Sequence, residues 1–382
     1  MRKEIICLFT ILASAACSGG PQTLKDALEG KFLIGAAINE AQIRGLDTRG
    51  DSVLLRHFNA IEPENCLKSE RIQPQKGVFV WDLADSYVDF GTRNNLAVYG
   101  HCLTWHSQLP DWFPKNDDGT DVTPEELKAR MREHIHTLVG RYKGRIVGWD
   151  VVNEAFLDDG SWRESPFYRI LGEEYIELSF RYAHEADPDA ELYYNDYNMF
   201  RKEKAETVAK LVNDLKAKGL RIDAVGFQGH YGIDYPDLDE LQQAIDIVTA
   251  TGVKIQFTEM EVTILPTLTR SADIGDKSFE EVVADPVLFE KHRSMFIPYP
   301  EGIPQEINER WNSRVESLWD LLLRNHDKIL RVNLWGIQDG DSWKNEYPTR
   351  IEGRQEYPLL FDRSFREKPC THWIIENAGS YK

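Results

Sequence analysis

Eight short apolar segments with the character of β-strands recur along this 382-residue chain, and longer amphipathic segments separate them. The strand-like segments are residues 32–38, 58–64, 96–103, 146–153, 191–196, 224–228, 254–259 and 330–335. Helical periodicity lies between them, as at 124–139, 173–185, 203–218, 238–249 and 307–325. Strands that alternate with helices pair in parallel, so eight such units predict a single (β/α)8 TIM barrel of α/β class.

A doubly wound open sheet would show the same alternation of strands and helices. That architecture usually carries a glycine-rich first turn, and neither GxGxxG nor GxxxxGK[ST] occurs in the sequence. One long interruption, roughly residues 262–305, follows the seventh strand. Loops of that length are usually functional or disordered, and this extended loop would lie on the face where barrels place their active sites.

The N-terminus has the pattern of an export signal. A basic Met1-Arg2-Lys3 start and an apolar run at 5–13 precede Ser14-Ala15-Ala16-Cys17, which resembles a bacterial lipobox. We therefore expect a signal peptide at 1–16, a lipidated Cys17 with a short tether over 17–23, and one globular domain over 24–382. The expected location is the outer membrane or cell surface, with the periplasm or secretion as alternatives.

Charge and cysteine content exclude several classes of function. The formal net charge of −18 disfavours nucleic acid and anionic lipid as partners, so the only membrane contact we expect is the lipid anchor. Cys66, Cys102 and Cys370 have no repeated spacing; one disulfide is possible, but three buried thiols are the simpler expectation. The sequence has no HExxH and no Cys/His cluster with ligand spacing, so we expect neither a metal nor a cofactor.

Polar and aromatic side chains stand at the ends of seven consecutive strands that are otherwise apolar. In a barrel those strand ends meet at the catalytic face. Two of these side chains are Glu154, after the fourth strand, and Glu259, after the seventh, which would face each other across the barrel mouth. A lone glutamate is usually a solvated surface charge, but one that closes an apolar strand fits that explanation poorly. Hydrolysis of a glycosidic bond needs two such carboxyl groups.

Several motifs together resemble family 10 glycoside hydrolases, the endo-β-1,4-xylanases. The first is Trp-Asp-Val-Val-Asn-Glu at 149–154, followed by Thr-Glu at 258–259. Further matching segments lie at 63–68, 101–112, 195–198, 226–230, 335–343 and 357–362, so the resemblance covers nearly all of the chain after the signal. Their common order and spacing make a chance match untenable.

The resemblance implies a role for each matching residue. Glu154 would be the acid/base and Glu259 the nucleophile of a retaining reaction, with carboxyl groups about 5–5.5 Å apart. Asn153 would bind the 2-hydroxyl of the reacting sugar, while Gln228 and His230 would orient Glu259. The implied substrate-binding residues are Glu64, Asn65, Lys68, His101, Trp105, Gln108, Tyr197, Trp335 and Trp343. The implied partner is xylan or xylo-oligosaccharides, bound by a monomer.

Two positions depart from the family pattern. Glu261 stands where the family usually has Asp; it shares a strand face with Glu259, could still support His230, and is itself a competing candidate nucleophile. Ser69 stands where many relatives have Trp. Two alternative functions remain open: a related β-1,4-glucanase or mannanase, and a non-catalytic xylan-binding surface lipoprotein.

Overall fold

Parallel strand pairing closes the sheet of this protein into a barrel. The computed structural model describes residues 22–265, 277–346 and 350–382. Strand β6 pairs with β8 on one side and with β5 on the other, which closes the ring β1-β2-β3-β4-β5-β6-β8-β9. The strands are β1 (Leu33–Ile38), β2 (Ala60–Pro63), β3 (Ala97–Thr104), β4 (Gly148–Asn153), β5 (Glu191–Asp196), β6 (Ala224–Phe227), β7 (His230–Gly232), β8 (Lys254–Thr263) and β9 (Ile329–Leu334).

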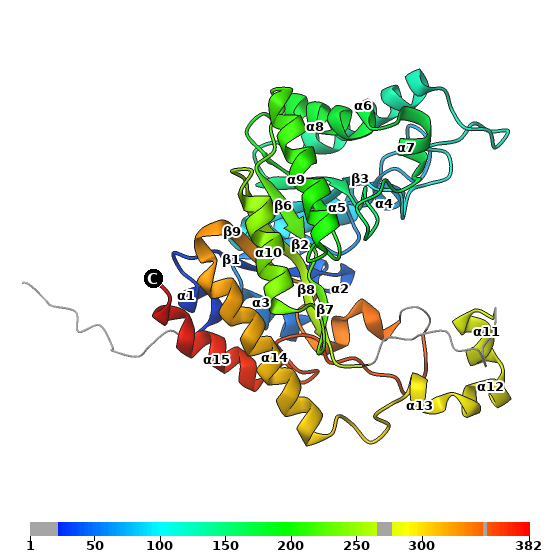
Figure 1. Cartoon of the computed structure of the whole chain (residues 1–382). Helices are drawn as coiled ribbons and strands as arrows, with labels where there is room; N and C mark the ends of the chain where they lie inside the picture. The colour runs from blue at the N-terminus through cyan, green and yellow to red at the C-terminus, as the bar shows by residue number, and fades with distance from the viewer. Residues whose placement is uncertain (1–21, 266–276, 347–349) are drawn as a thin grey trace, which may run out of the picture.

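Helices follow the strands in turn and form the outer layer (Figure 1). The long ones are α3 (Thr48–His57), α5 (Asp82–Arg93), α6 (Pro124–Arg141), α8 (Glu174–Ala186), α9 (Lys202–Ala217), α10 (Leu238–Thr249), α14 (Gln305–Arg324) and α15 (Pro369–Asn377). Short helices are α1 (Leu24–Ala27), α2 (Glu40–Ile43), α4 (Ser69–Ile72), α7 (Pro166–Leu171), α11 (Phe279–Ala284), α12 (Pro286–Lys291) and α13 (Arg293–Phe296). The 3₁₀ turns in the described ranges are η1 (His326–Lys328), η2 (Asp339–Asp341), η3 (Trp343–Asn345) and η4 (Ala378–Ser380).

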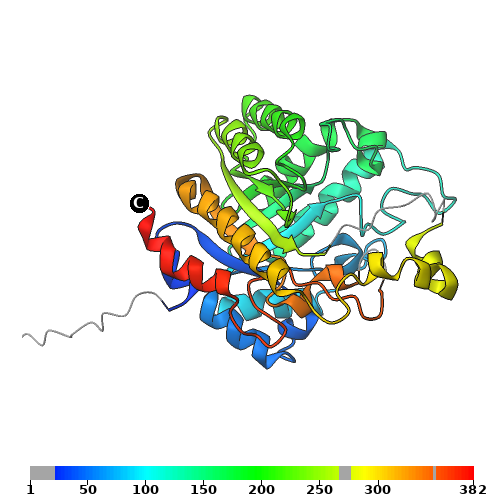
Figure 2. The same ribbon diagram turned by 60° about the horizontal axis from the view of Figure 1, so that its bottom comes forward.

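Local sequence explains where these elements begin and why they pack. Thr123 caps α6 by accepting a hydrogen bond from the Glu126 amide at 3.2 Å, and Pro124 occupies the first turn, where its missing N–H costs nothing. The strands are buried on both faces, as parallel strands between a core and a helical layer must be. The last helix, α15, packs beside α14 and α1, and Figure 2 shows α14 and α15 side by side on the outside of the barrel.

The predicted barrel is confirmed, with small shifts at strand ends. The 191–196 strand and the 238–249 helix have the predicted bounds, whereas β8 continues to Thr263. The three-residue strand β7 was not predicted; it pairs with β8, beyond a turn in which Gly229 takes a positive φ of 82°. Cys66, Cys102 and Cys370 are buried free thiols, as expected.

The segment after β8 is the main feature that periodicity did not resolve. In it, α11, α12 and α13 form a small separate apolar cluster around Val282, Phe296, Ile297 and Ile351, and they project to one side of the barrel (Figure 1). The predicted signal peptide, Cys17 and most of the tether lie outside the described residues. Within the described ranges, no helix has the length and apolar character that a membrane span requires.

Candidate active site

One cleft of about 680 Å³ brings together the side chains that follow the barrel strands. Every catalytic and substrate-binding residue expected from the sequence lines it except Glu261, which lies behind it. The lining residues are Glu64, Asn65, Lys68, His101, Trp105, His106, Ser107, Gln108, Asn153, Glu154, Tyr197, Asn198, Gln228, His230, Tyr235, Glu259, Trp335, Trp343 and Lys344. The chain thus collects the carboxylates of Glu64, Glu154 and Glu259, several amides, three tryptophans and two tyrosines around one open space.

Backbone hydrogen bonds to neighbouring strands fix the two glutamates. The Glu154 amide donates to the Asn195 carbonyl at 2.9 Å, and the Glu259 amide donates to the Gln228 carbonyl at 2.8 Å. Glu154 comes directly after β4 with a φ of 58°, in the left-handed region that residues other than glycine rarely adopt. Such strain persists only where the surroundings impose it, and it is common at functional sites.

Side-chain amides connect the two carboxylates across the cleft floor. The Gln228 amide donates to Glu154 Oε1 at 3.0 Å, and the Asn195 amide donates to Glu259 Oε1 at 2.9 Å. Between them, the oxygen of Asn153 accepts from Asn195 at 3.0 Å and from Gln228 at 3.2 Å. In its opposite orientation the Asn153 amide would instead accept from Trp105 Nε1 at 3.3 Å. Either way, Asn153 lies between the two acids, where its amide can reach a ligand in the cleft.

His230 lies between two carboxylates of β8. Its Nε2 is 3.2 Å from Glu259 Oε2, and its Nδ1 is 2.8 Å from Glu261 Oε1. Burial by itself lowers the pKa of His230, but the bonds to both carboxylates outweigh it and raise that pKa to about 9. The ring is therefore an imidazolium at neutral pH. Burial raises the pKa of Glu259, but the hydrogen bond from His230 and nearby positive charge hold it below its usual value.

Glu261 is buried, and hydrogen-bond donors surround its carboxylate. Besides His230, it accepts from Trp343 Nε1 at 2.7 Å and from Ser342 Oγ at 3.2 Å, and Lys344 Nζ lies 3.7 Å away. Burial raises the pKa of Glu261, but Lys344 and His230 outweigh it and lower that pKa. Because Glu261 does not line the cleft, the geometry favours its support of His230 over a role as nucleophile.

Polar groups from β2 and β3 occupy the other side of the cleft. Lys68 donates to Asn65 Oδ1 at 3.0 Å, and Gln108 reaches the same oxygen at 3.3 Å. His101 Nδ1 lies 2.9 Å from Asp150 Oδ2, and burial lowers the pKa of His101. A neutral ring that donates from Nδ1 to Asp150 leaves Nε2 as an acceptor for a sugar hydroxyl. Glu64 lies close by, and burial raises its pKa.

Aromatic rings wall the cleft. Trp335 packs edge-on to His101, with ring centroids 5.5 Å apart, and Lys68 Nζ lies 5.1 Å from the Trp105 ring. Trp343 is edge-on to His230 at 5.4 Å. Tyr197, after β5, accepts a hydrogen bond from Arg163 at 2.5 Å. Such surfaces suit the apolar faces of pyranose rings.

Sequence reasoning missed several members of this site. Asp150 and Asn195 both stood in recognised motifs, but only the structure shows that Asp150 fixes His101 and that Asn195 bonds both Asn153 and Glu259. Arg163 and Lys344 carried no strand-end signal and were not predicted. At the departure Ser69, the buried hydroxyl lies 3.4 Å from His134 Nε2.

One buried group has the spacing of a metal site. Single ligand atoms of Glu62, His101 and Asp150 lie within 4.8 Å of one another. Arg331 donates to both oxygens of Glu62, at 2.8 and 3.1 Å, so a guanidinium already supplies the positive charge there. His101 likewise uses Nδ1 on Asp150. We interpret this group as a hydrogen-bonded ion-pair network beneath the cleft.

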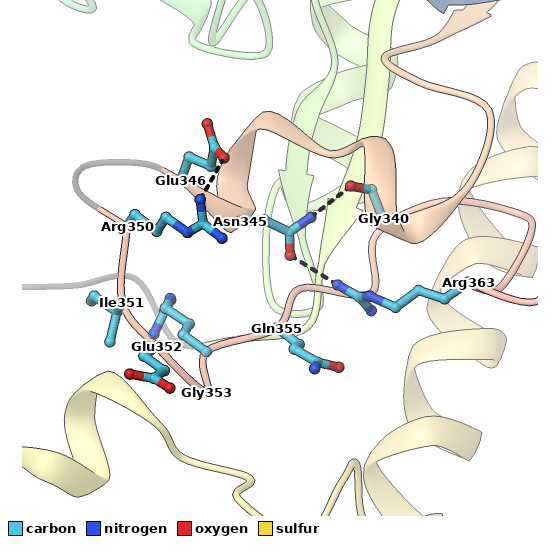
Figure 3. Close-up of a pocket in the computed structure, with 10 residues that line it drawn as sticks. Gly340, Asn345, Glu346, Arg350, Ile351, Glu352, Gly353, Gln355 and Arg363 are labelled. Carbon is cyan, nitrogen blue, oxygen red and sulfur yellow. Dashed lines mark hydrogen bonds and ion pairs between the residues drawn. The ribbon is translucent and has the colours of Figure 1, made fainter. Parts of the chain in front are cut away.

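A second hollow, of about 660 Å³, lies in the loops after β9 (Figure 3). Its charged side chains contact protein partners: Arg350 Nη1 lies 4.0 Å from Glu346 Oε1, and Arg363 donates to Asn345 Oδ1 at 2.9 Å. The described residues around it include no tryptophan and none of the strand-end side chains. The cleft at the strand ends is therefore the better candidate for chemistry.

The chain is similar to known proteins in both sequence and fold. The model of "Glycosyl hydrolase family 10" matches residues 23–377. The chain is 42% identical over 378 residues to "Endo-1,4-beta-xylanase A" of Xylanibacter ruminicola, covering 98% of this chain and 99% of that protein. It is 36% identical over 365 residues to an endo-1,4-beta-xylanase of Geobacillus stearothermophilus, covering 94% and 99%. A solved GH10 endoxylanase from a sugarcane soil metagenome superposes with a TM-score of 0.83 at 38% identity, covering 93% and 99%.

Proposed function

This chain belongs to glycosyl hydrolase family 10, and from that premise we propose that it hydrolyses internal β-1,4-xylosidic bonds of xylan with retention of configuration. Glu154 is the acid/base and Glu259 the nucleophile. The observation that carries the assignment is the pair of glutamates, Glu154 directly after β4 and Glu259 within β8, which line one cleft and share one amide network.

The charges around Glu259 suit it to attack. Its pKa is held below the usual value by His230, and the Asn195 amide holds its other oxygen, so the carboxylate is ionised and fixed in place. Glu259 bonds to the anomeric carbon while the bond from that carbon to the leaving oxygen breaks. Glu154 gives its proton to that oxygen, and the leaving sugar chain departs as an alcohol.

The second half of the reaction runs through the same two residues. Glu154, now a carboxylate, takes a proton from water, and the hydroxide attacks the anomeric carbon as the bond to Glu259 breaks. The sugar leaves with the configuration it had at the start. Asn153 and His101 line the same cleft, and their hydrogen bonds to hydroxyls of the reacting sugar would strengthen as positive charge grows at its ring.

A comparison of three polysaccharides tests the substrate class. Relatives named as xylanases support xylan, and a β-1,4-glucanase or mannanase remains the alternative within this fold. Equal amounts of xylan, cellulose and mannan, assayed for reducing ends, should show release from xylan above all. Glu259→Ala is the matched blank: it should leave xylan binding intact and abolish release. Binding without release by the unmodified protein would instead support the non-catalytic xylan-binding alternative.

Configuration is tested separately by proton NMR of fresh products. Retention predicts that the β-anomer of the new reducing end appears first and that the α-anomer grows only by mutarotation. If the α-anomer appears first, the carboxyl pair acts through water in an inverting reaction, and the nucleophile assignment is wrong.

We further propose export and lipid anchoring through Cys17, with a monomeric hydrolase domain over 24–382. The support is sequence alone, namely Ser14-Ala15-Ala16-Cys17 after a basic and apolar start. Metabolic labelling with a fatty acid should mark the wild type in the outer membrane fraction and should not mark Cys17→Ser. Light scattering of the domain should give a mass of one chain.

A further inference from the structure

Arg163 reaches the main chain of Glu154 from a short loop. Its Nε donates to the Glu154 carbonyl oxygen at 2.9 Å, while the Glu154 amide is already held by Asn195. Both ends of the residue are therefore bonded, and this is the residue whose φ is 58°. A main chain in the left-handed region is strained for a residue other than glycine and needs such restraint.

The loop that carries Arg163 is itself well fixed. The Arg163 amide donates to the Ala155 carbonyl at 2.9 Å, and Phe156 and Trp162 form an antiparallel bridge with ring centroids 4.6 Å apart. The Ala155 amide in turn donates to the Tyr194 hydroxyl at 3.1 Å. The guanidinium is thus presented to Glu154 by a rigid turn, not by a free surface side chain.

The same guanidinium holds Tyr197 on the cleft wall. Arg163 Nη2 donates to the Tyr197 hydroxyl oxygen at 2.5 Å. Because that oxygen accepts from Arg163, its own hydrogen is free to point into the cleft and donate to a sugar oxygen. One arginine therefore links the backbone of Glu154 to a hydroxyl of the cleft lining.

We propose that Arg163 is a positioning residue for acid/base catalysis, which locks Glu154 in its left-handed conformation and aims its carboxyl at the glycosidic oxygen. The proposal rests on the function given above. Within the described residues, the Arg163 guanidinium donates hydrogen bonds to the Glu154 carbonyl and the Tyr197 hydroxyl and to no atom of Glu259, so its loss should disturb proton transfer and leave attack by Glu259 intact. A lysine cannot replace it fully, because one ammonium lacks the forked donors that span both oxygens.

The test compares two substrates whose leaving groups differ in their need for a proton. Xylotetraose has a poor leaving group, whereas a dinitrophenyl xylobioside releases a phenolate that is stable without protonation. For Arg163→Met we expect kcat/KM on xylotetraose to fall about 10–100-fold, since misplaced acid catalysis costs that much. On the dinitrophenyl substrate kcat/KM should stay within about threefold of wild type.

Azide gives a readout of the second step. With the dinitrophenyl substrate, kcat of Arg163→Met should fall, because hydrolysis of the glycosyl-enzyme needs Glu154 as base. Azide is a nucleophile that needs no base, so it should restore kcat and yield the β-xylobiosyl azide. Arg163→Lys, the milder variant, should show the same pattern with a smaller loss. It carries the test if Arg163→Met does not fold.

Controls separate this role from a structural one. Arg169→Met removes an exposed arginine paired with Asp121 at 2.8 Å and should change neither substrate's kinetics. Tyr197→Phe should cost less than Arg163→Met on xylotetraose; an equal cost would mean that Arg163 acts only through Tyr197. Equal losses on both substrates, or no loss on xylotetraose, would overturn the proposal. Failure of wild type to cleave xylotetraose would refute the proposed function instead.

Discussion

Glu259 and Glu261 lie two residues apart on β8 and bind the same imidazolium, yet their neighbours give them different roles. Glu259 lines the cleft, while Glu261 is covered by Ser342 and Trp343. The sequence predicted both acids because they end an apolar strand inside a recognised motif. The local sequence does not show which of the two acids faces the cleft, because enclosure by residues 81 and 82 positions away has no local signal.

Removing the charge of Glu261 should shift the pH range of activity. Glu261→Gln deletes one of the two carboxylates that raise the pKa of His230 to about 9, so the imidazolium is lost at lower pH. Since that cation keeps Glu259 ionised and oriented, the alkaline limb of kcat/KM should move to lower pH. Glu261→Asp keeps the charge and serves as the control. An unchanged alkaline limb in Glu261→Gln would refute the role given to this pair.

The same variant makes a prediction for stability. His230, with its raised pKa, contributes stability that is full below about pH 6.5 and lost as pH rises through about 9. Glu261, with its lowered pKa, contributes stability that is present above about pH 4.5 and lost as pH falls. Urea titrations should therefore show the greatest difference between wild type and Glu261→Gln near pH 4.5–6.5. A difference independent of pH would contradict this linkage.

At the scale of elements, apolar runs located the strands and amphipathic runs located the main helices. What they could not supply is the pairing of polar groups inside the barrel. Arg331 on β9 bonds Glu62 on β2, 269 positions away, and donates to Gln256 on β8 at 2.8 Å. In the sequence alone, an arginine within an apolar strand has no visible partner, because Glu62 and Gln256 become its neighbours only when the barrel closes. The helices α11 to α13 were missed because each has six residues or fewer.

Breaking that pair should destabilise the barrel. Arg331→Met leaves the Glu62 carboxylate buried beside Asn333 and Gln256, and we expect a loss of about 3–5 kcal/mol in the free energy of unfolding. Denaturant titration measures it. The double variant Arg331→Met with Glu62→Leu should recover much of the loss, because no uncompensated charge remains. If the double variant is as unstable as the single one, the defect is packing and not charge.

At the scale of the whole molecule, one barrel carries a satellite cluster that should unfold separately. Phe296→Ala removes a buried ring that packs against Phe279 and Phe289. Large-to-small changes of this kind cost about 3–5 kcal/mol, and here the cost should fall on the segment around α11–α13. Limited proteolysis should cut within residues 277–304 faster, while the main thermal transition changes little. A matching fall in the temperature of the main thermal transition would show that the cluster belongs to the barrel's cooperative unit.

Identification of the residue that bonds the sugar tests the account most directly. A 2-deoxy-2-fluoro xylobioside with a good leaving group forms the glycosyl-enzyme and slows its hydrolysis, so the adduct can be digested and sequenced by mass spectrometry. We predict one adduct, on Glu259, which Glu261→Gln still forms and Glu259→Gln does not. An adduct on Glu261, or turnover with no adduct on either residue, would contradict the assignment of the nucleophile.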